Sequence, residues 1–208
     1  MTRPIIIDCD PGQDDAVNLL MALAAPGALD VLGITAVAGN VPLALTERNA
    51  RLLCGLAGRD DVPVFAGCER PLVRELVTAE HVHGDSGIDG VDLGAPAVPL
   101  QPAHATDFIV ETLLSAPDAS VTLVPTGPLT NIAHALIKAP AIAPKIREIV
   151  LMGGAMREGG NLSPSAEFNI LVDPHAARVV FDCGRPLTVF GLDVTHQVPT
   201  TPERLRRI

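Results

Sequence analysis

Four carboxylates lie within eight positions near the start of the chain, at Asp8, Asp10, Asp14 and Asp15. They follow three isoleucines at residues 5–7, a run typical of a buried strand, and Pro11 and Gly12 break that run before a helical pattern begins at Ala16. Carboxylates this close repel one another, and a bound cation relieves that repulsion. Oxygen ligands select a hard ion such as Ca²⁺ or Mg²⁺, and no His or Cys lies at the ligand spacing that zinc requires. The pattern therefore predicts a metal site at the end of a strand.

A simpler interpretation is a set of helix-capping acids on a solvated face. Asp14 and Asp15 fall in the first helical turn, where unpaired backbone N–H groups favour negative charge, so either residue fits that interpretation. Asp8 and Asp10 fit it poorly because they end a hydrophobic strand. Open α/β sheets bind their ligands at the carboxyl ends of strands. We therefore favour a functional site.

The composition indicates a folded protein that does not bind nucleic acid. The chain has 208 residues, 48% of them hydrophobic, which suits a sizeable core and excludes a disordered chain. Its net charge of −9 opposes binding to nucleic-acid phosphates or to an anionic membrane. With no Trp, no Tyr and five Phe, it offers few side chains on which bases could stack.

The four cysteines show no C-x-x-C pair and no regular spacing; they are Cys9, Cys54, Cys68 and Cys183. We interpret them as core thiols of a reduced protein. No secretory signal is visible, because only three strong apolar residues separate Arg3 from Asp8, and no apolar run is long enough to span a bilayer. These features predict a cytoplasmic protein without a membrane partner.

Strand and helix patterns alternate along the chain. This predicts a Rossmann-like α/β fold with a mostly parallel central sheet and helices on both faces. After the first strand and helix, strands are expected over residues 29–37, 62–65, 121–124, 146–152 and 186–192. Helices are expected over residues 42–58, 106–114, 131–138 and 174–181, the last two capped by Thr130 and Asp173. Residues 66–94 are expected to form a long loop and residues 97–102 a connector, all within one domain over residues 1–208.

Polar side chains follow some of these strands. Asn40 follows the second strand and would share the carboxyl edge with Asp10, although an Asn after Gly is more often a turn residue. His81 and His83 lie in the long loop, which is typical of a binding loop, yet a His pair with no third ligand is commonly just exposed. Both interpretations of the histidines stay open from the residues alone.

Two further segments could approach a ligand. The turn at residues 125–131 contains two prolines and a glycine, and a rigid turn at a strand end can present a backbone carbonyl to a cation. Four glycines between residues 153 and 160 predict a loop that approaches a ligand closely or moves. Glu167 and Asn169 alternate with apolar neighbours and could face one polar pocket together with Asn161. No P-loop or dinucleotide-binding glycine pattern is present.

The run Asp8-x-Asp10-Pro-Gly-x-Asp14-Asp15-Ala resembles the N-terminal signature of the inosine-uridine-preferring nucleoside hydrolases. The resemblance continues through His-Gly-x-x-Gly-x-Asp-Gly at residues 83–90, Thr-Gly-Pro-Leu-Thr-Asn at residues 126–131 and the Asn-to-Glu-Phe-Asn segment at residues 161–169. It therefore covers nearly the whole chain. It implies a calcium-dependent enzyme that hydrolyses the N-glycosidic bond of purine or pyrimidine ribonucleosides, and a homo-oligomer, a dimer or a tetramer.

The resemblance also implies roles for individual residues. Asp10 would be the general base on a calcium-bound water, and the calcium ligands would be Asp10, Asp15 and the carbonyl of Thr126. The ribose would be held by Asp14, Asn40, Asn161, Glu167 and Asn169. His83 would lie near the nucleobase, and Asp8 would support the metal ligands from behind. The carboxylates would stabilise the oxocarbenium-like ribosyl ring as the base leaves.

The resemblance does not extend to the family's C-terminal part. There, members carry a His-Asp pair that completes the calcium site and protonates the leaving base. His196 matches an earlier segment, so we do not give it that role. A helix start with a cap and a proline at residues 200–203 has no terminator before Ile208, so the chain is expected to be truncated.

Two alternatives to an active hydrolase remain. The first is a weakly active or inactive remnant that binds calcium and a ribose-containing ligand. The second is a Mg²⁺-dependent phosphatase that uses Asp8 and Asp10 as nucleophile and acid. A phosphatase should carry basic groups for the phosphate, and Arg157 is the main cation near the candidate loops, which makes the phosphatase the weaker alternative.

Overall fold

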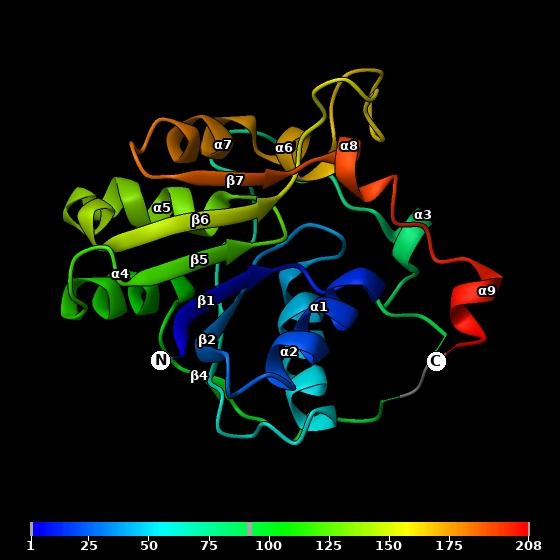
Figure 1. Ribbon diagram of the computed structural model, residues 1–208, viewed down its shortest axis with the longest axis horizontal. Coiled ribbons are helices and arrows are strands. Elements are labelled where there is room, and N and C mark those ends of the chain that lie inside the picture. The colour runs from blue at the N-terminus through cyan, green and yellow to red at the C-terminus, as the bar shows by residue number, and fades with distance from the viewer. Residues whose placement is uncertain (1, 91–92, 208) are drawn as a thin grey trace.

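In the computed structural model of the protein, residues 2–90 and 93–207 are described, and within them the strands form a seven-stranded sheet in the order β4-β3-β2-β1-β5-β6-β7 (Figure 1). Every pairing in this sheet is parallel. The strands are β1 Arg3–Cys9, β2 Leu29–Ala36, β3 Val64–Ala66, β4 Leu100–Gln101, β5 Val121–Pro125, β6 Ile146–Met152 and β7 Leu187–Phe190. The predicted α/β class is confirmed, and the sheet is more uniformly parallel than expected.

The helices cover both faces of the sheet (Figure 1). They are α1 Gln13–Leu23, α2 Leu43–Leu56, α3 Glu80–His83, α4 Ala105–Ser115, α5 Thr130–Lys138, the 3₁₀ helix η1 Pro140–Lys145, α6 Phe168–Val172, α7 Pro174–Phe181, α8 Leu192–Thr195 and α9 Pro202–Leu205. Helices α1 and α2 pack on one face, and α4, α5, η1 and α7 pack on the other. Within the described residues, no helix combines the length and apolarity needed to cross a membrane.

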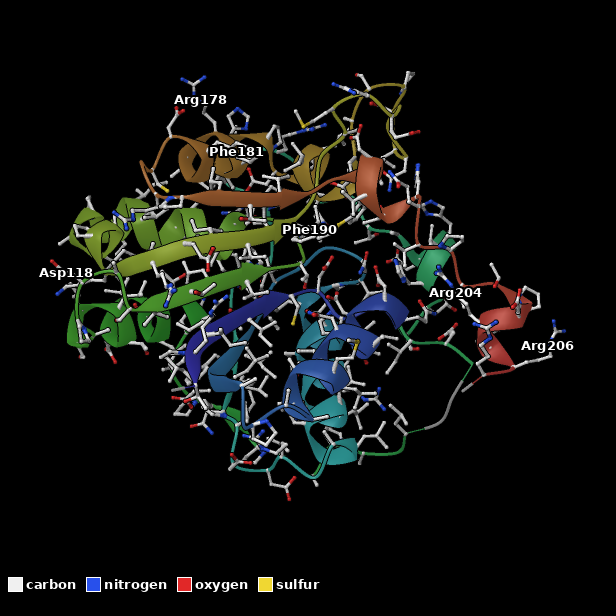
Figure 2. All side chains as sticks on the ribbon, in the orientation of Figure 1. Asp118, Arg178, Phe181, Phe190, Arg204 and Arg206 are labelled. Carbon is white, nitrogen blue, oxygen red and sulfur yellow. The ribbon has the colours of Figure 1, made fainter. Side chains whose placement is uncertain are left out.

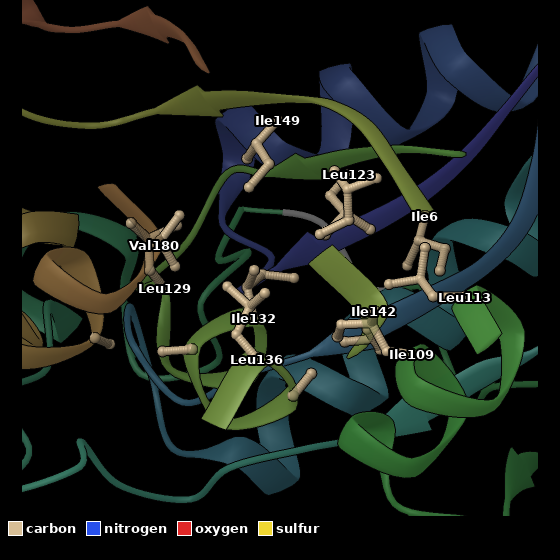
Figure 3. Close-up of a cluster of buried hydrophobic side chains, with 14 of the residues drawn as sticks. Ile6, Ile109, Leu113, Leu123, Leu129, Ile132, Leu136, Ile142, Ile149 and Val180 are labelled. Carbon is tan, nitrogen blue, oxygen red and sulfur yellow. The ribbon is translucent and has the colours of Figure 1, made fainter. Parts of the chain in front are cut away.

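The side chains of β1 alternate between two hydrophobic cores. Ile5 and Ile7 belong to the core under α1 and α2, whereas Ile6 belongs to the core under α4 and α5. Figure 3 shows Ile6 and Leu123 of the sheet among the buried side chains of the helices on that second face. Each such fully buried side chain contributes about 1.5–3 kcal/mol of hydrophobic stabilisation. Because both faces are covered, the middle of β1 is hydrophobic at residues 5–7, and the buried Asp8 that follows within the strand needs a specific partner.

The chain order of the strands creates a switch point beside β1. From β1 the sheet grows outward through β2, β3 and β4, and the chain then returns to place β5 on the other side of β1. Ligands of open α/β sheets bind where the strand order reverses, beyond the carboxyl ends of the strands. Here that place lies between the ends of β1 and β5, and the short helices α6 and α8 lie beyond the ends of β6 and β7 (Figure 1).

Several short elements differ from expectation. The connector at residues 97–102 contains the edge strand β4, and the long loop contains α3. Two-residue strands and four-residue helices are too short to show a period in sequence. Positions 91 and 92 of that loop, and the chain end at Ile208, lie outside the described residues.

The two predicted helix caps had different outcomes. Asp173 caps α7 as expected, accepting a hydrogen bond from the N–H of Ala176 at 2.9 Å. The expectation that Thr130 caps α5 is wrong, because Thr130 lies inside the helix and Leu129 is its N-cap residue. The Thr130 hydroxyl instead donates to Asp173 Oδ2 at 2.9 Å. It therefore ties α5 to the start of α7.

The sheet ends at β7, whose outer edge has no partner strand among the described residues. Figure 2 labels Phe181 of α7 and Phe190 of β7, which are 45% and 43% exposed. The same view shows Arg178 and Arg206 projecting outward from the ribbon.

Candidate functional site

One cleft of about 290 Å³ opens at the switch point, and nine of the ten sequence-predicted site residues line it. These nine are Asp10, Asp14, Asp15, Asn40, His83, Thr126, Asn161, Glu167 and Asn169. They come from segments up to 159 positions apart, because the parallel strands bring all their carboxyl ends to one edge. The tenth residue, Asp8, lies deeper, within the sheet.

Asp10 directly follows β1 and is 1% exposed. The backbone N–H of Asn40 donates to Asp10 Oδ2 at 2.7 Å, and the Asn40 side-chain amide donates to the Asp10 carbonyl at 2.9 Å. Asn40 therefore fixes the position of Asp10 in addition to lining the cleft. Two glycines leave room for this carboxylate: a Cβ at Gly39 would overlap Asp10 Oδ2, and one at Gly127 would lie 2.5 Å from Oδ1.

Asp14 and Asp15 occupy the first turn of α1, as the sequence predicted. Asp15 is 5% exposed and accepts the hydroxyl hydrogen bond of Thr126 at 2.6 Å. Asp14 is exposed on the cleft wall and accepts from the backbone N–H of Asp15 at 3.0 Å. The Asp15–Thr126 bond links α1 to the turn after β5, so the two halves of the switch point meet at these side chains.

Asp8 is fully buried beneath the cleft. Thr35 Oγ1 and Asn131 Nδ2 donate to its Oδ1 at 2.6 and 2.8 Å, while its Oδ2 has no hydrogen-bond partner among the described residues. Sequence reasoning missed both partners, because Thr35 and Asn131 are apolar-strand and helix-start positions with no local sign of pairing to an acid. Burial raises the pKa of Asp8 to about 7, although the hydrogen bonds from Thr35 and Asn131 oppose the rise.

Burial and repulsion by neighbouring acids raise the pKa values of two cleft carboxyls, Asp10 and Asp15. The pKa of Asp10 is raised well above its usual range by burial first and by the charge of Asp15 second. Burial and the charge of Asp14 raise the pKa of Asp15 to about 7. Two neighbouring acids that resist ionisation together, Asp10 and Asp15, form a site that favours a bound positive charge.

Glu167 and Asn169 stand at the start of α6, on the opposite wall of the cleft. Glu167 is the N-cap residue, accepting from the N–H of Asn169 at 2.9 Å, and its Oε2 also accepts from the N–H of Gly154 at 2.8 Å. The Asn169 side-chain amide donates to the carbonyls of Thr126 and Met152, at 2.8 and 3.2 Å. Asn161 is exposed at the rim and accepts from the N–H of Phe168 at 2.9 Å.

His83 lies at the other end of the cleft, where it meets the start of α1. Its Nδ1 lies 2.6 Å from Gln13 Oε1, and Gln13 Nε2 donates to the His83 carbonyl at 3.0 Å. Sequence reasoning missed the apolar part of the lining, which consists of Ala79, Val82, Met152, Leu162 and Phe168. Phe168 lies between Glu167 and Asn169, so the alternation noted in the sequence was a usable sign. The lining of the cleft therefore combines acidic and amide side chains with apolar ones.

The donor set suits a hard cation. Within residues 2–90 and 93–207, no three His, Cys, Asp or Glu side chains are arranged to hold a metal ion by themselves. A cation at Asp10 and Asp15 would take further oxygen ligands from the Thr126 carbonyl, water and bound hydroxyls, and Ca²⁺ accepts about six to eight oxygens. The Thr126 carbonyl already accepts from Asn169 but retains a second lone pair. The residues present therefore fit calcium.

Comparisons with known proteins identify the family. The sequence profile of the family described as inosine-uridine preferring nucleoside hydrolase matches residues 5–208. The pyrimidine-specific ribonucleoside hydrolase RihB of Escherichia coli O157:H7 is 50% identical over 206 residues, which are 99% of this chain and 64% of that protein. The pyrimidine-specific ribonucleoside hydrolase RihA of Photobacterium profundum is 50% identical over 208 residues, 100% of this chain and 66% of that protein.

Solved structures of nucleoside hydrolases are similar to this chain over almost its whole length. A plant nucleoside hydrolase, PpNRh1, superposes with a TM-score of 0.93 at 37% identity, over 99% of this chain and 65% of that one. A purine-preferring ribonucleoside hydrolase from Gardnerella vaginalis superposes with a TM-score of 0.90 at 36% identity, over 99% and 66%. The chain thus spans about two thirds of the length of these relatives. From the profile match, the identity and the shared fold, the chain belongs to the inosine-uridine preferring nucleoside hydrolase family.

Proposed function

We propose that the cleft binds a ribonucleoside and hydrolyses its N-glycosidic bond, releasing ribose and the free base. The observation that carries this proposal is the convergence of three carboxylates, Asp10, Asp14 and Asp15, with Glu167 and Asn169 in one cleft. Carboxylates stabilise the positive charge that develops on the ribosyl ring. Glu167 and Asn169 offer polar groups for the sugar hydroxyls, and the apolar lining residues, Phe168 among them, suit a base.

Calcium is part of the proposal. Asp10, Asp15 and the Thr126 carbonyl would hold it, and when bound it would supply positive charge that orients a water and the ribose hydroxyls. The raised pKa values of Asp10 and Asp15 support this, because a cation favours the ionised forms that burial opposes.

Residues of the chain account for the activation of the attacking water. Asp10 takes a proton from the attacking water as the water oxygen bonds to the anomeric carbon of the ribose. The bond from that carbon to the base nitrogen breaks, and its electron pair leaves with the base, which then takes up a proton from solvent water. Asn40 keeps the Asp10 carboxylate in place through the 2.7 Å backbone hydrogen bond. The buried Asp8 would support this wall of the site without touching substrate.

A panel of ribonucleosides tests the proposal. Inosine, uridine, cytidine and adenosine are incubated with the protein in Ca²⁺ or in a chelator, and free ribose is measured. Release that depends on Ca²⁺ is the expected result. Absence of release at every Ca²⁺ concentration would overturn the proposed hydrolysis. If calorimetry then showed that the same nucleosides bind, the result would support the second candidate function, a chain that binds calcium and a riboside without turning it over.

A phosphatase has less support. Among the described residues that line the cleft there is no lysine or arginine to hold a phosphate. Release of phosphate from an aryl phosphate would support the phosphatase again.

Cytoplasmic location and a homo-oligomer stay predictions. The four unpaired cysteines support a reducing compartment.

Replacing Gly39 by Ala is expected to lower ribose release by at least about 10²-fold, because the new methyl group overlaps Asp10 Oδ2 and displaces the general base. Steady-state kinetics on uridine or inosine would measure it. The matched control is Gly55→Ala in α2, where a Cβ meets no atom within 4 Å and activity should be unchanged. A Gly39→Ala enzyme as active as Gly55→Ala would contradict the close approach at Asp10.

Replacing Glu167 by Gln is expected to weaken riboside binding by about tenfold, or about 1.4 kcal/mol, while free bases bind as before. The amide keeps an acceptor for the cap of α6 but loses the charge that grips sugar hydroxyls. Calorimetry with a riboside and, separately, with its free base would measure the two affinities. Glu111→Gln on the exposed face of α4 serves as the control, and equal losses for riboside and base would remove Glu167 from the ribose site.

A further inference from the structure

A single carboxylate holds the glycine loop, which we define as residues 153–160 between β6 and α6. The Asp193 side chain accepts from three successive backbone N–H groups of this loop. Met156 and Arg157 donate at 2.8 Å each, and Glu158 donates at 3.2 Å. These hydrogen bonds lower the pKa of Asp193, with the Met156 bond the largest cause. Asp193 belongs to α8, which lies beside the loop in Figure 1.

The backbone joins the same two segments on the sheet side. The N–H of Gly153 donates to the Phe190 carbonyl at 3.1 Å, and the N–H of Leu192 donates to the Gly154 carbonyl at 2.9 Å. A Cβ at Gly191 would lie 2.7 Å from the Gly154 carbonyl oxygen, so a side chain there would separate the segments. The first residues of the loop are thus paired with the end of β7, and Asp193 holds the residues that follow.

The other side of the loop contacts the proposed ribose site. The N–H of Gly154 donates to Glu167 Oε2 at 2.8 Å. Gly154 has a φ of +82°, in the left-handed region that a side chain would strain, so this amide is aimed at Glu167 by a glycine-specific backbone shape. The position of the loop therefore determines one of the hydrogen bonds that orient the Glu167 carboxylate.

We infer that Asp193 is a positioning residue: it fixes the glycine loop so that Gly154 holds Glu167 in its ribose-binding orientation. The inference rests on the proposed function for its ribose part only. The other anchors of the middle of the loop are weak. Residues 156–159 are all exposed, Met156 is 90% exposed, and His196 Nδ1 lies 3.7 Å from Glu158 Oε2 between half-exposed side chains. Where apolar burial is this small, charge-assisted hydrogen bonds decide whether a loop keeps one conformation.

The first test is amide hydrogen exchange on the full chain, followed residue by residue with NMR. In Asp193→Ala, exchange at Met156, Arg157, Glu158 and Gly154 is expected to be at least about tenfold faster. Asp193→Asn keeps one carbonyl acceptor and should give a smaller increase. Asp182→Asn, which breaks a surface ion pair with Arg178, is the matched control and should leave these amides unchanged.

The second test is riboside affinity in the same variants. Asp193→Ala is expected to weaken riboside binding or raise KM by about five- to tenfold, with little change in kcat and none in the binding of free base. Asp193→Asn should restore part of the affinity. If Asp193 had a merely structural role, its loss would lower the amount of folded protein and therefore the apparent kcat, and KM would stay unchanged.

The outcomes separate the inference from the proposed function. Unchanged exchange at residues 156–158 in Asp193→Ala would overturn the inference. So would faster exchange there with normal protection at Gly154 and normal riboside affinity, because the loop would then not act on Glu167. If the wild-type chain binds no riboside, the proposed function fails. Hydrogen exchange at the Gly154 amide then remains as the test of whether Asp193 controls the contact with Glu167.

Discussion

Replacing Asp10 by Asn is expected to reduce ribose release by at least about 10³-fold, because an amide cannot take the proton of the attacking water and loses a charge that would hold calcium. The replacement has nearly the same shape, and the Asn40 N–H can still donate to the amide oxygen at position 10. Single-turnover kinetics with a ribonucleoside at saturating Ca²⁺ would measure the loss.

The fold should survive this replacement. Asp10 is 1% exposed and its pKa is raised, so its ionised form is costly in the metal-free protein and a neutral amide removes that cost. We expect the Tm of Asp10→Asn in chelator to equal or exceed that of the wild type near pH 8. Asp182→Asn controls for the loss of a surface acid. A folded Asp10→Asn protein with near-normal turnover would remove Asp10 from the role of general base.

The metal-free protein is expected to lose stability as the pH rises from 5.5 to 8. Asp8 and Asp15 have folded pKa values of about 7, above the ordinary 3.8, so the folded state holds protons that the unfolded state has released. Their contribution is greatest at low pH and is lost as the pH rises through about 7. Across this range each group accounts for about 2 kcal/mol, and together they should lower the Tm by about 10 °C.

Calcium should reverse this loss at pH 8, where fewer protons compete with the cation for the cleft carboxylates. Thermal unfolding with chelator and with millimolar Ca²⁺ at both pH values would measure the two effects. Asp61, Asp89, Asp107 and Asp193 have lowered pKa values, and their opposite contribution is complete below the range compared. Asp8→Asn is a further control, because it should remove its share of the pH dependence and leave most of the Ca²⁺ response. Equal Tm values in chelator at both pH values, with no response to Ca²⁺, would contradict the predicted metal site.

The long elements and most of the site could be predicted because their signals are local. Residues 5–7 are apolar in succession because β1 is covered on both faces, and the acids at Asp10, Asp14 and Asp15 follow directly after that strand ends. Strand β6 begins and ends where its pattern does, at Ile146 and Met152. The short elements β4 and α3 gave no such signal, because neither is long enough to repeat a period.

The sequence by itself determined the α/β class and the acidic strand end, because periodicity and motif spacing are properties of neighbouring positions. Its resemblance to a family implied which residues share the cleft. Only the tertiary structure decided which distant polar groups form hydrogen bonds with one another. Asn131 lies under Asp8 from 123 positions away, Asn169 bridges to the Thr126 carbonyl, and Asp193 holds the amides of the glycine loop. Buried or converging polar groups must find partners wherever the packed sheet brings a donor within reach, and that choice depends on strand order and register rather than on separation along the chain.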